Sequence, residues 1–104
     1  MQIVNILEIN RFEFSQSEKD FLERFFLIVK DDLWEKLTFG EYAFLNSQIM
    51  SNKCYIELTD DQFKLFSDFV IDAREILSEN YPQEAFNLME FIWALEDKLG
   101  LYIA

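Results

Sequence analysis

Residues 59–78 read TDDQFKLFSDFVIDAREILS and carry the strongest helix start in the chain. Thr59 can act as the N-cap and Gln62 stands in the reciprocal position of a capping box, while two Asp residues lie at the positive end of the helix dipole. Apolar side chains then recur at three- and four-residue steps, which predicts an amphipathic helix to about Ser78. Six of them are expected to face inward: Phe66, Phe69, Val70, Ala73, Ile76 and Leu77.

A second long helix is predicted before this stretch. It begins at Ser15-Gln-Ser-Glu18, which has the form of a capping box, although Ser17 with Asp20 offers an alternative register for the same start. The three- and four-residue apolar steps continue to about Leu37. The expected inward side chains are Phe21, Leu22, Phe25, Ile28, Val29 and Leu33.

A third long helix is predicted after this stretch. Asn80-Tyr-Pro82 ends the preceding helix, and Pro82 suits the first turn of a last one that runs to about Leu99, where Gly100 is a natural C-cap. The expected inward side chains are Ala85, Leu88, Met89, Ile92, Trp93, Leu95 and Leu99.

Shorter elements fill the remaining sequence. Two-residue alternation predicts strands within residues 2–14 and over residues 53–58. Residues 42–50 favour a short helix, although a strand that turns at Ser51-Asn52 is the alternative. Residues 101–103 are apolar enough to pack or to add a strand. The fold class that results is mainly helical α+β, with about four helices packed with a small two- or three-stranded sheet.

Composition indicates one folded domain with a strongly acidic surface. The 104 residues suit a single compact domain over residues 1–104, and apolar residues make up 51% of them. Nine basic and 20 acidic residues give a net charge of −11, which repels nucleic acid and anionic lipid. We therefore expect no direct binding to nucleic acid or membrane, and a basic protein as the partner.

Several chemistries lack the residues that they need. The chain has no His, and a single thiol, Cys54, cannot make an internal disulfide or a zinc site. Its two glycines, Gly40 and Gly100, stand alone, so no phosphate-binding loop is present. We therefore expect no enzymatic activity, no cofactor and no metal.

The sequence also predicts where the protein resides. Residues 1–5 contain no Lys or Arg, which disfavours a signal peptide, and the longest apolar run covers only residues 25–29. A cytoplasmic location is expected, as a monomer or a dimer.

The candidate binding residues lie mainly on the predicted helix over residues 59–78. Five carboxylates fall within about 60° of its circumference and extend along about 27 Å of its axis. This acidic stripe consists of Asp61, Asp68, Asp72, Glu75 and Glu79. It is either the solvated face of a very acidic protein or a docking surface for a basic partner.

Trp34 is the second candidate for partner binding. Trp34 and Leu27 fall off the apolar side of their helix, and Trp is enriched among interface anchors. The alternative is that a second layer, formed by residues 42–50, covers both side chains.

Three function classes fit these features. The first is a small inhibitor, most simply a bacterial immunity protein that blocks the basic active site of a nuclease-type toxin, because an acidic surface speeds encounter with a basic one. The second is a nucleic-acid mimic of a phage or mobile element that acts against a host defence protein. The third is a secretion-type chaperone or adaptor, which would use exposed apolar patches.

Overall fold

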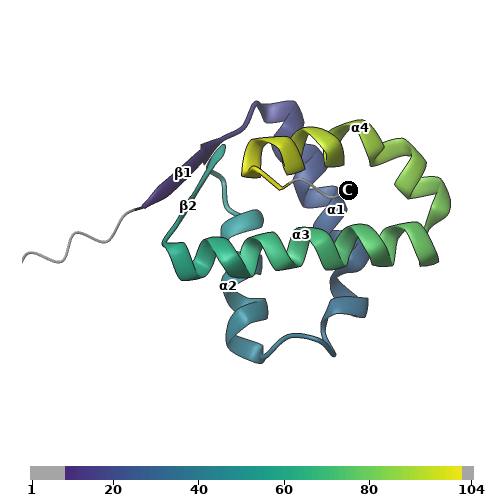
Figure 1. The fold of residues 1–104 in the computed structure, drawn as a ribbon, viewed down its shortest axis with the longest axis horizontal. Coiled ribbons are helices and arrows are strands. Elements are labelled where there is room, and N and C mark those ends of the chain that lie inside the picture. Colours follow the sequence, from purple (N-terminus) through teal and green to yellow (C-terminus); the bar gives the residue numbers. More distant parts are fainter. Residues whose placement is uncertain (1–8, 102–104) are drawn as a thin grey trace, which may run out of the picture.

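The computed structural model describes residues 9–101, which form four helices and one small sheet (Figure 1). The elements in chain order are β1 (Asn10–Glu13), α1 (Gln16–Leu33), α2 (Phe39–Ile49), β2 (Tyr55–Leu58), α3 (Asp60–Asn80) and α4 (Pro82–Leu99). The mainly helical α+β fold predicted from the sequence is confirmed. Residues 2–8 of the predicted first strand and residues 102–103 of the predicted terminal segment lie outside the described residues.

Capping boxes start three of the helices. In each, the N-cap hydroxyl accepts the backbone N–H three residues later, and the side chain of that later residue accepts the N-cap N–H. The three pairs are Ser15 with Glu18, Thr38 with Glu41, and Thr59 with Gln62. The first helix therefore uses Ser15 and not Ser17. Residues 42–49 belong to a helix that begins three residues earlier than expected and has Met50 as its C-cap.

The end of α1 differs from the sequence prediction, whereas the end of α4 agrees with it. The helix α1 ends at Leu33 and not near Leu37, because the chain must reverse so that Thr38 can take the extended backbone (ψ 160°) that caps α2. The N–H of Lys36 bonds to the carbonyl of Leu33 in this turn. At the end of α4, Gly100 has φ 72°, the left-handed conformation expected of a glycine C-cap.

The two strands pair antiparallel, with Arg11 opposite Glu57 and Phe12 opposite Ile56. The alternation places Ile56 and Leu58 in the core, whereas Arg11 pairs with Glu57 at 3.2 Å on the outer face. The sheet thus covers one edge of the helical core with one apolar face.

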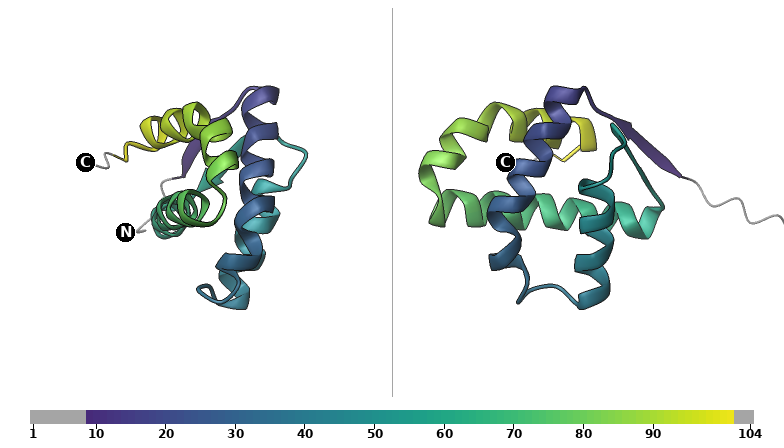
Figure 2. Two further views of the ribbon diagram at one scale, coloured as in Figure 1. Left: turned by 90° about the vertical axis from the view of Figure 1, so that its right-hand side faces the viewer. Right: turned by 180° about the vertical axis from the view of Figure 1, so that it is seen from behind.

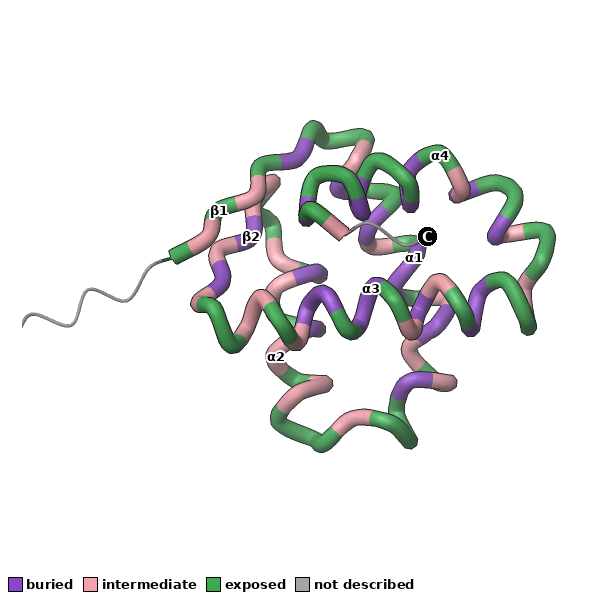
Figure 3. Tube along the Cα trace, in the orientation of Figure 1, coloured by how far each residue is buried: buried purple, intermediate pink, exposed green. Residues whose placement is uncertain are grey.

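The core lies between α1 and the pair formed by α3 and α4. The helix α1 contacts all three other helices, and α3 and α4 lie on the same side of it (Figure 2). The ring of Phe69 on α3 lies 5.7–5.9 Å from the rings of Phe25, Phe26 and Phe66. All six predicted inward side chains of α3 are buried, and buried and exposed positions alternate along α3 as an amphipathic helix requires (Figure 3).

Two predicted core aromatics are wrong. Trp93 is 55% exposed, because the buried face of α4 is centred on Leu88 and Ile92 and the helical rotation of about 100° per residue carries position 93 past its edge. Phe21 is 39% exposed and stacks on Phe91 at the edge of the α1–α4 contact, with ring centroids 5.7 Å apart.

Charged side chains tie the elements together. Lys19 of α1 is buried, and its Nζ donates to the carbonyl of Ser51 at 2.6 Å and to Glu23 at 3.2 Å. The pKa of the Glu18 carboxyl is lowered from its usual value. The main cause is the backbone N–H of Ser15, which donates to the carboxylate, and the nearby Lys98 ammonium adds to it, whereas partial burial opposes both. The α1 cap is therefore formed by an ionised group.

Candidate functional site

The acidic stripe occupies the side of α3 that faces away from the core. Four of its members are exposed and Asp72 is half-buried. This placement follows from the sequence, because the buried face of α3 consists of apolar side chains and Ser67, which pack on α1 and α4. The carboxylates therefore point into solvent from a rigid helix of 21 residues.

The stripe carboxylates have no ion-pair partner within residues 9–101. The ion pairs of that range link Arg11 to Glu13 and Glu57, Lys19 to Glu23, Arg24 to Glu84, Arg74 to Glu96, and Lys98 to Glu18. None of these carboxylates belongs to the stripe. Lys64, which is exposed at the edge of the stripe between Asp61 and Asp68, offsets only part of its negative charge.

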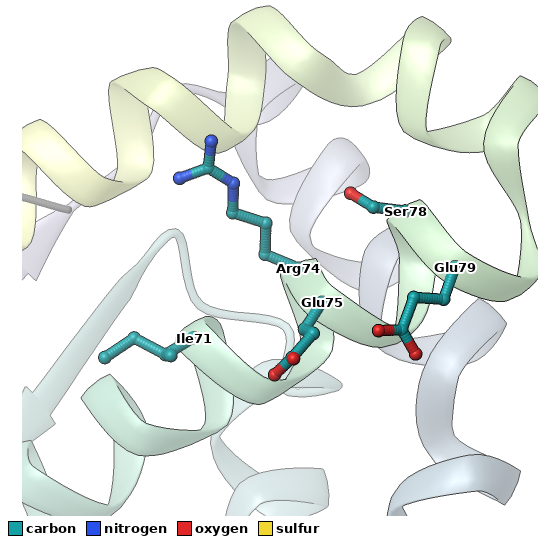
Figure 4. A pocket seen from close by; sticks show the side chains of 5 residues that line it. All are labelled: Ile71, Arg74, Glu75, Ser78 and Glu79. Atoms are coloured by element: carbon teal, nitrogen blue, oxygen red, sulfur yellow. The ribbon is translucent and has the colours of Figure 1, made fainter. Parts of the chain in front are cut away.

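Arg74 is one of the two basic residues of α3, with Lys64, and its charge is already paired. It points toward α4, whereas Glu75 and Glu79 point away from α4 (Figure 4). Its Nη1 donates to both carboxylate oxygens of Glu96, at 2.9 and 3.0 Å, and Glu96 is buried. This pair neutralises both residues at the α3–α4 contact, so Arg74 does not offset the charge of the stripe.

A shallow hollow of about 350 Å³ lies beside the stripe (Figure 4). Its lining combines one apolar side chain, a hydroxyl, two carboxylates and the guanidinium of Arg74, which is paired with Glu96: Ile71, Arg74, Glu75, Ser78 and Glu79. A partner side chain that enters it would meet the exposed side chain of Ile71 and two carboxylates. This combination suits the long aliphatic stem and cationic head of a lysine or arginine.

Trp34 lies on a different part of the molecule, at the C-terminal end of α1. Its ring lies edge-on to the rings of Tyr42 and Phe39 of α2, with centroid distances of 4.8 and 6.4 Å. The segment proposed as a covering layer thus covers it in part, and Trp34 remains 52% exposed. Phe39 is 77% exposed, so Trp34, Phe39 and Tyr42 form an aromatic patch of α1 and α2, and Leu27 on α1 is 47% exposed.

A second apolar surface was missed by the sequence analysis. Phe86 is 79% exposed, Trp93 is 55% exposed, and Met89 is half-buried between them along α4. These three residues, called the α4 patch below, line a hollow of about 540 Å³ together with Asn87 and Glu90. The signal was present in the sequence, because Phe86 and Trp93 are seven residues apart and lie about 20° from each other around the helix.

No group of three or more His, Cys, Asp and Glu residues within residues 9–101 could hold a metal ion. Cys54 is half-buried, and its Sγ lies 3.5 Å from the amide oxygen of Gln16. No helix in this part of the chain is both long and apolar enough to cross a membrane.

Comparison with known protein families, with curated proteins and with solved structures finds no match to this chain. Two surfaces of the described residues are therefore candidates for partner binding: the acidic stripe of α3 and the exposed aromatic side chains.

Proposed function

We propose that this protein is a small acidic inhibitor that acts by stoichiometric binding to a basic protein. The observation that carries the proposal is the row of five carboxylates on the exposed face of α3, none of which has an ion-pair partner within the described residues. Like charges three and four residues apart weaken a helix, so the row has a cost that a binding role would explain.

The partner class follows from electrostatics. A nuclease must hold a polyanion and therefore presents a basic active site, whose field attracts a row of carboxylates and raises the association rate. We propose an immunity protein that neutralises such a bacterial toxin by covering its active site. The α3 stripe would lie over the basic cleft, and an exposed aromatic side chain, such as Trp34, would fill a pocket nearby.

The exposed aromatic side chains favour one alternative class. A secretion-type chaperone or adaptor binds through apolar surface, and Phe39, Phe86 and Trp93 are all more than half exposed. Such a protein would form a stable dimer or hold an unfolded client. Light scattering on the purified protein tests this class, because a stable dimer that still exposes apolar area favours the chaperone and a strict monomer favours an inhibitor or a nucleic-acid mimic.

The test of the inhibitor proposal is capture from a lysate of the source organism at about 50 mM salt, where screening is weak. We expect one basic protein in stoichiometric amount. That protein should be toxic when it is expressed alone and harmless when it is expressed with the acidic protein. A captured protein that is not toxic alone would contradict the immunity proposal.

Two matched variants assign the capture to the stripe. The stripe-reversed variant carries Asp68→Lys, Asp72→Lys and Glu75→Lys, which reverses three of the five carboxylates. The control variant makes the same charge change on exposed residues of α1 and the turn that follows it, with Asp20→Lys, Asp31→Lys and Glu35→Lys. We expect the first variant to lose the partner and the second to retain it, and equal retention would show that the stripe is a solvated face.

A further inference from the structure

The α4 patch has the composition of a binding surface. Exposed Phe, Trp and Met side chains are enriched in protein interfaces, and two of the three members of this patch are more than half exposed. They recur at positions 86, 89 and 93, so they form a ridge along about 10 Å of the helix. A ridge of this kind packs against a second helix, whose own side chains fill the grooves beside it.

The charges around the α4 patch are all negative or neutralised. Glu90 and Asp97 are exposed on the same side of α4, and neither forms an ion pair within residues 9–101. On the other flank, Met89 and Glu96 lie about 20° apart around the helix, so the patch borders the contact where Glu96 meets Arg74 of α3. The carboxylate of Glu75 lines the hollow on the far side of that contact.

This charge pattern selects the occupant. A second copy of the chain would bring Glu90 and Asp97 of both copies together, and each copy has a net charge of −11. An anionic lipid surface would be repelled for the same reason. An apolar ridge that has unpaired carboxylates along one flank and a neutralised ion pair along the other is instead complementary to a helix whose apolar face is bordered by lysine or arginine.

We propose that the α4 patch binds a basic amphipathic helix of a partner protein, with Phe86 and Trp93 as anchors and Glu90 and Asp97 as contacts for its cationic side chains. The proposal rests on the proposed function only in so far as the inhibited protein is the one that supplies this helix. Binding of an isolated helix to the patch stands independently of it.

The probe is a designed 18-residue helix in which leucines at positions i, i+3, i+4 and i+7 are flanked by lysines. Its affinity is measured by isothermal titration calorimetry for the native protein and for two variants, Phe86→Ser and Phe39→Ser. The second is a matched control, because the two phenylalanines are almost equally exposed, at 79% and 77%, and lie on different helices. We expect Phe86→Ser to weaken binding about tenfold or more and Phe39→Ser to change it less than about twofold.

Four results would overturn the proposal: no binding of the probe, equal affinities of the two variants, equal binding of a peptide with glutamate in place of lysine, or a dimer that Phe86→Ser dissociates. A further measurement tests whether another part of the chain already covers the patch. In the Trp34→Phe variant, Trp93 is the single tryptophan, and we expect a neutral quencher to reach it readily. Full shielding of Trp93 would show that the patch is not available to a partner.

The two proposals fail in different ways. The Phe86→Ser variant retains all five stripe carboxylates, and the stripe-reversed variant retains the α4 patch. If the captured partner is lost only by the stripe-reversed variant, the proposed function stands and the α4 patch is not part of its interface. If it is lost only by Phe86→Ser, the patch binds the partner and the stripe does not.

Discussion

Reversing the central charge of the acidic stripe should stabilise the fold. Asp72 has a like charge four residues before it, Asp68, and another three residues after it, Glu75. Pairs at these spacings interact by about 0.2–0.5 kcal/mol, as repulsion between like charges and as attraction between opposite ones. In Asp72→Lys both pairs change sign, so the expected gain in the free energy of unfolding is about 0.8–2 kcal/mol at low salt. In thermal unfolding this corresponds to about 4–8 °C per kcal/mol for a domain of this size.

The assay is urea unfolding at low salt and at 1 M salt. Lysine also has a better helix propensity than aspartate, which adds a few tenths of a kcal/mol that salt does not change. The electrostatic part is therefore the difference between the two salt conditions, because the screening length falls to about 3 Å at 1 M.

The matched control for this prediction is Glu90→Lys. Glu90 is exposed in the middle of α4 and has no charged residue three or four positions away, yet the substitution changes the net charge equally. We expect a change within about 0.5 kcal/mol for this variant. An equal gain in both variants would show that overall net charge, and not the local row on α3, limits stability. A loss for Asp72→Lys would refute the reasoning about the row.

Three further predictions concern helix capping, core packing and the loss of stability at acid pH. Thr59→Ala should lower the free energy of unfolding by about 1 kcal/mol in urea, whereas Ser17→Ala, an exposed site in the first turn of α1, should change it by less than about 0.5 kcal/mol. Leu77→Ala should lower the free energy of unfolding in urea by about 2–5 kcal/mol because Leu77 is fully buried. Leu27→Ala, at a site that is 47% exposed, should lower it by less than about 1 kcal/mol. Glu18 has a lowered pKa in the fold, so its contribution to stability is present above pH 4.5 and is lost as the pH falls through the folded pKa. In urea titrations, the difference in the free energy of unfolding between the native protein and Glu18→Gln should therefore shrink over that range. A constant difference would contradict the role assigned to Glu18.

Most of the fold was predictable because the capping signals and the spacing of the apolar residues indicate the same helices. The capping boxes at Ser15 and Thr59 and the glycine after α4 specify where those elements begin or end, and the inward face of α3 was correct at every predicted position. The end of α1 was not predictable from the same rules. Its last turn gives way to the reversal that Thr38 requires, which depends on where α2 packs and not on local propensity.

The exposed face of a helix could be predicted only where its apolar and polar residues occupy separate sides. The apolar and acidic residues of α3 occupy opposite sides, so the acidic stripe could be read from spacing alone. The helix α4 is apolar around most of its circumference, and the sequence does not show which of its apolar residues meets α3 and α1. The helical pattern therefore predicts that Trp93 faces inward, although the tertiary contacts of Leu88 and Ile92 leave it exposed.

The most direct test of the central claim is the salt dependence of the association rate with the captured partner, measured by stopped flow for the native protein and the stripe-reversed variant. An attraction between the α3 stripe and a basic cleft predicts fast association of the native protein that falls steeply as salt rises. The stripe-reversed variant should associate more slowly and with little dependence on salt. Equal rates and equal salt slopes for the two proteins would contradict the claim, because the carboxylates of α3 would then take no part in binding.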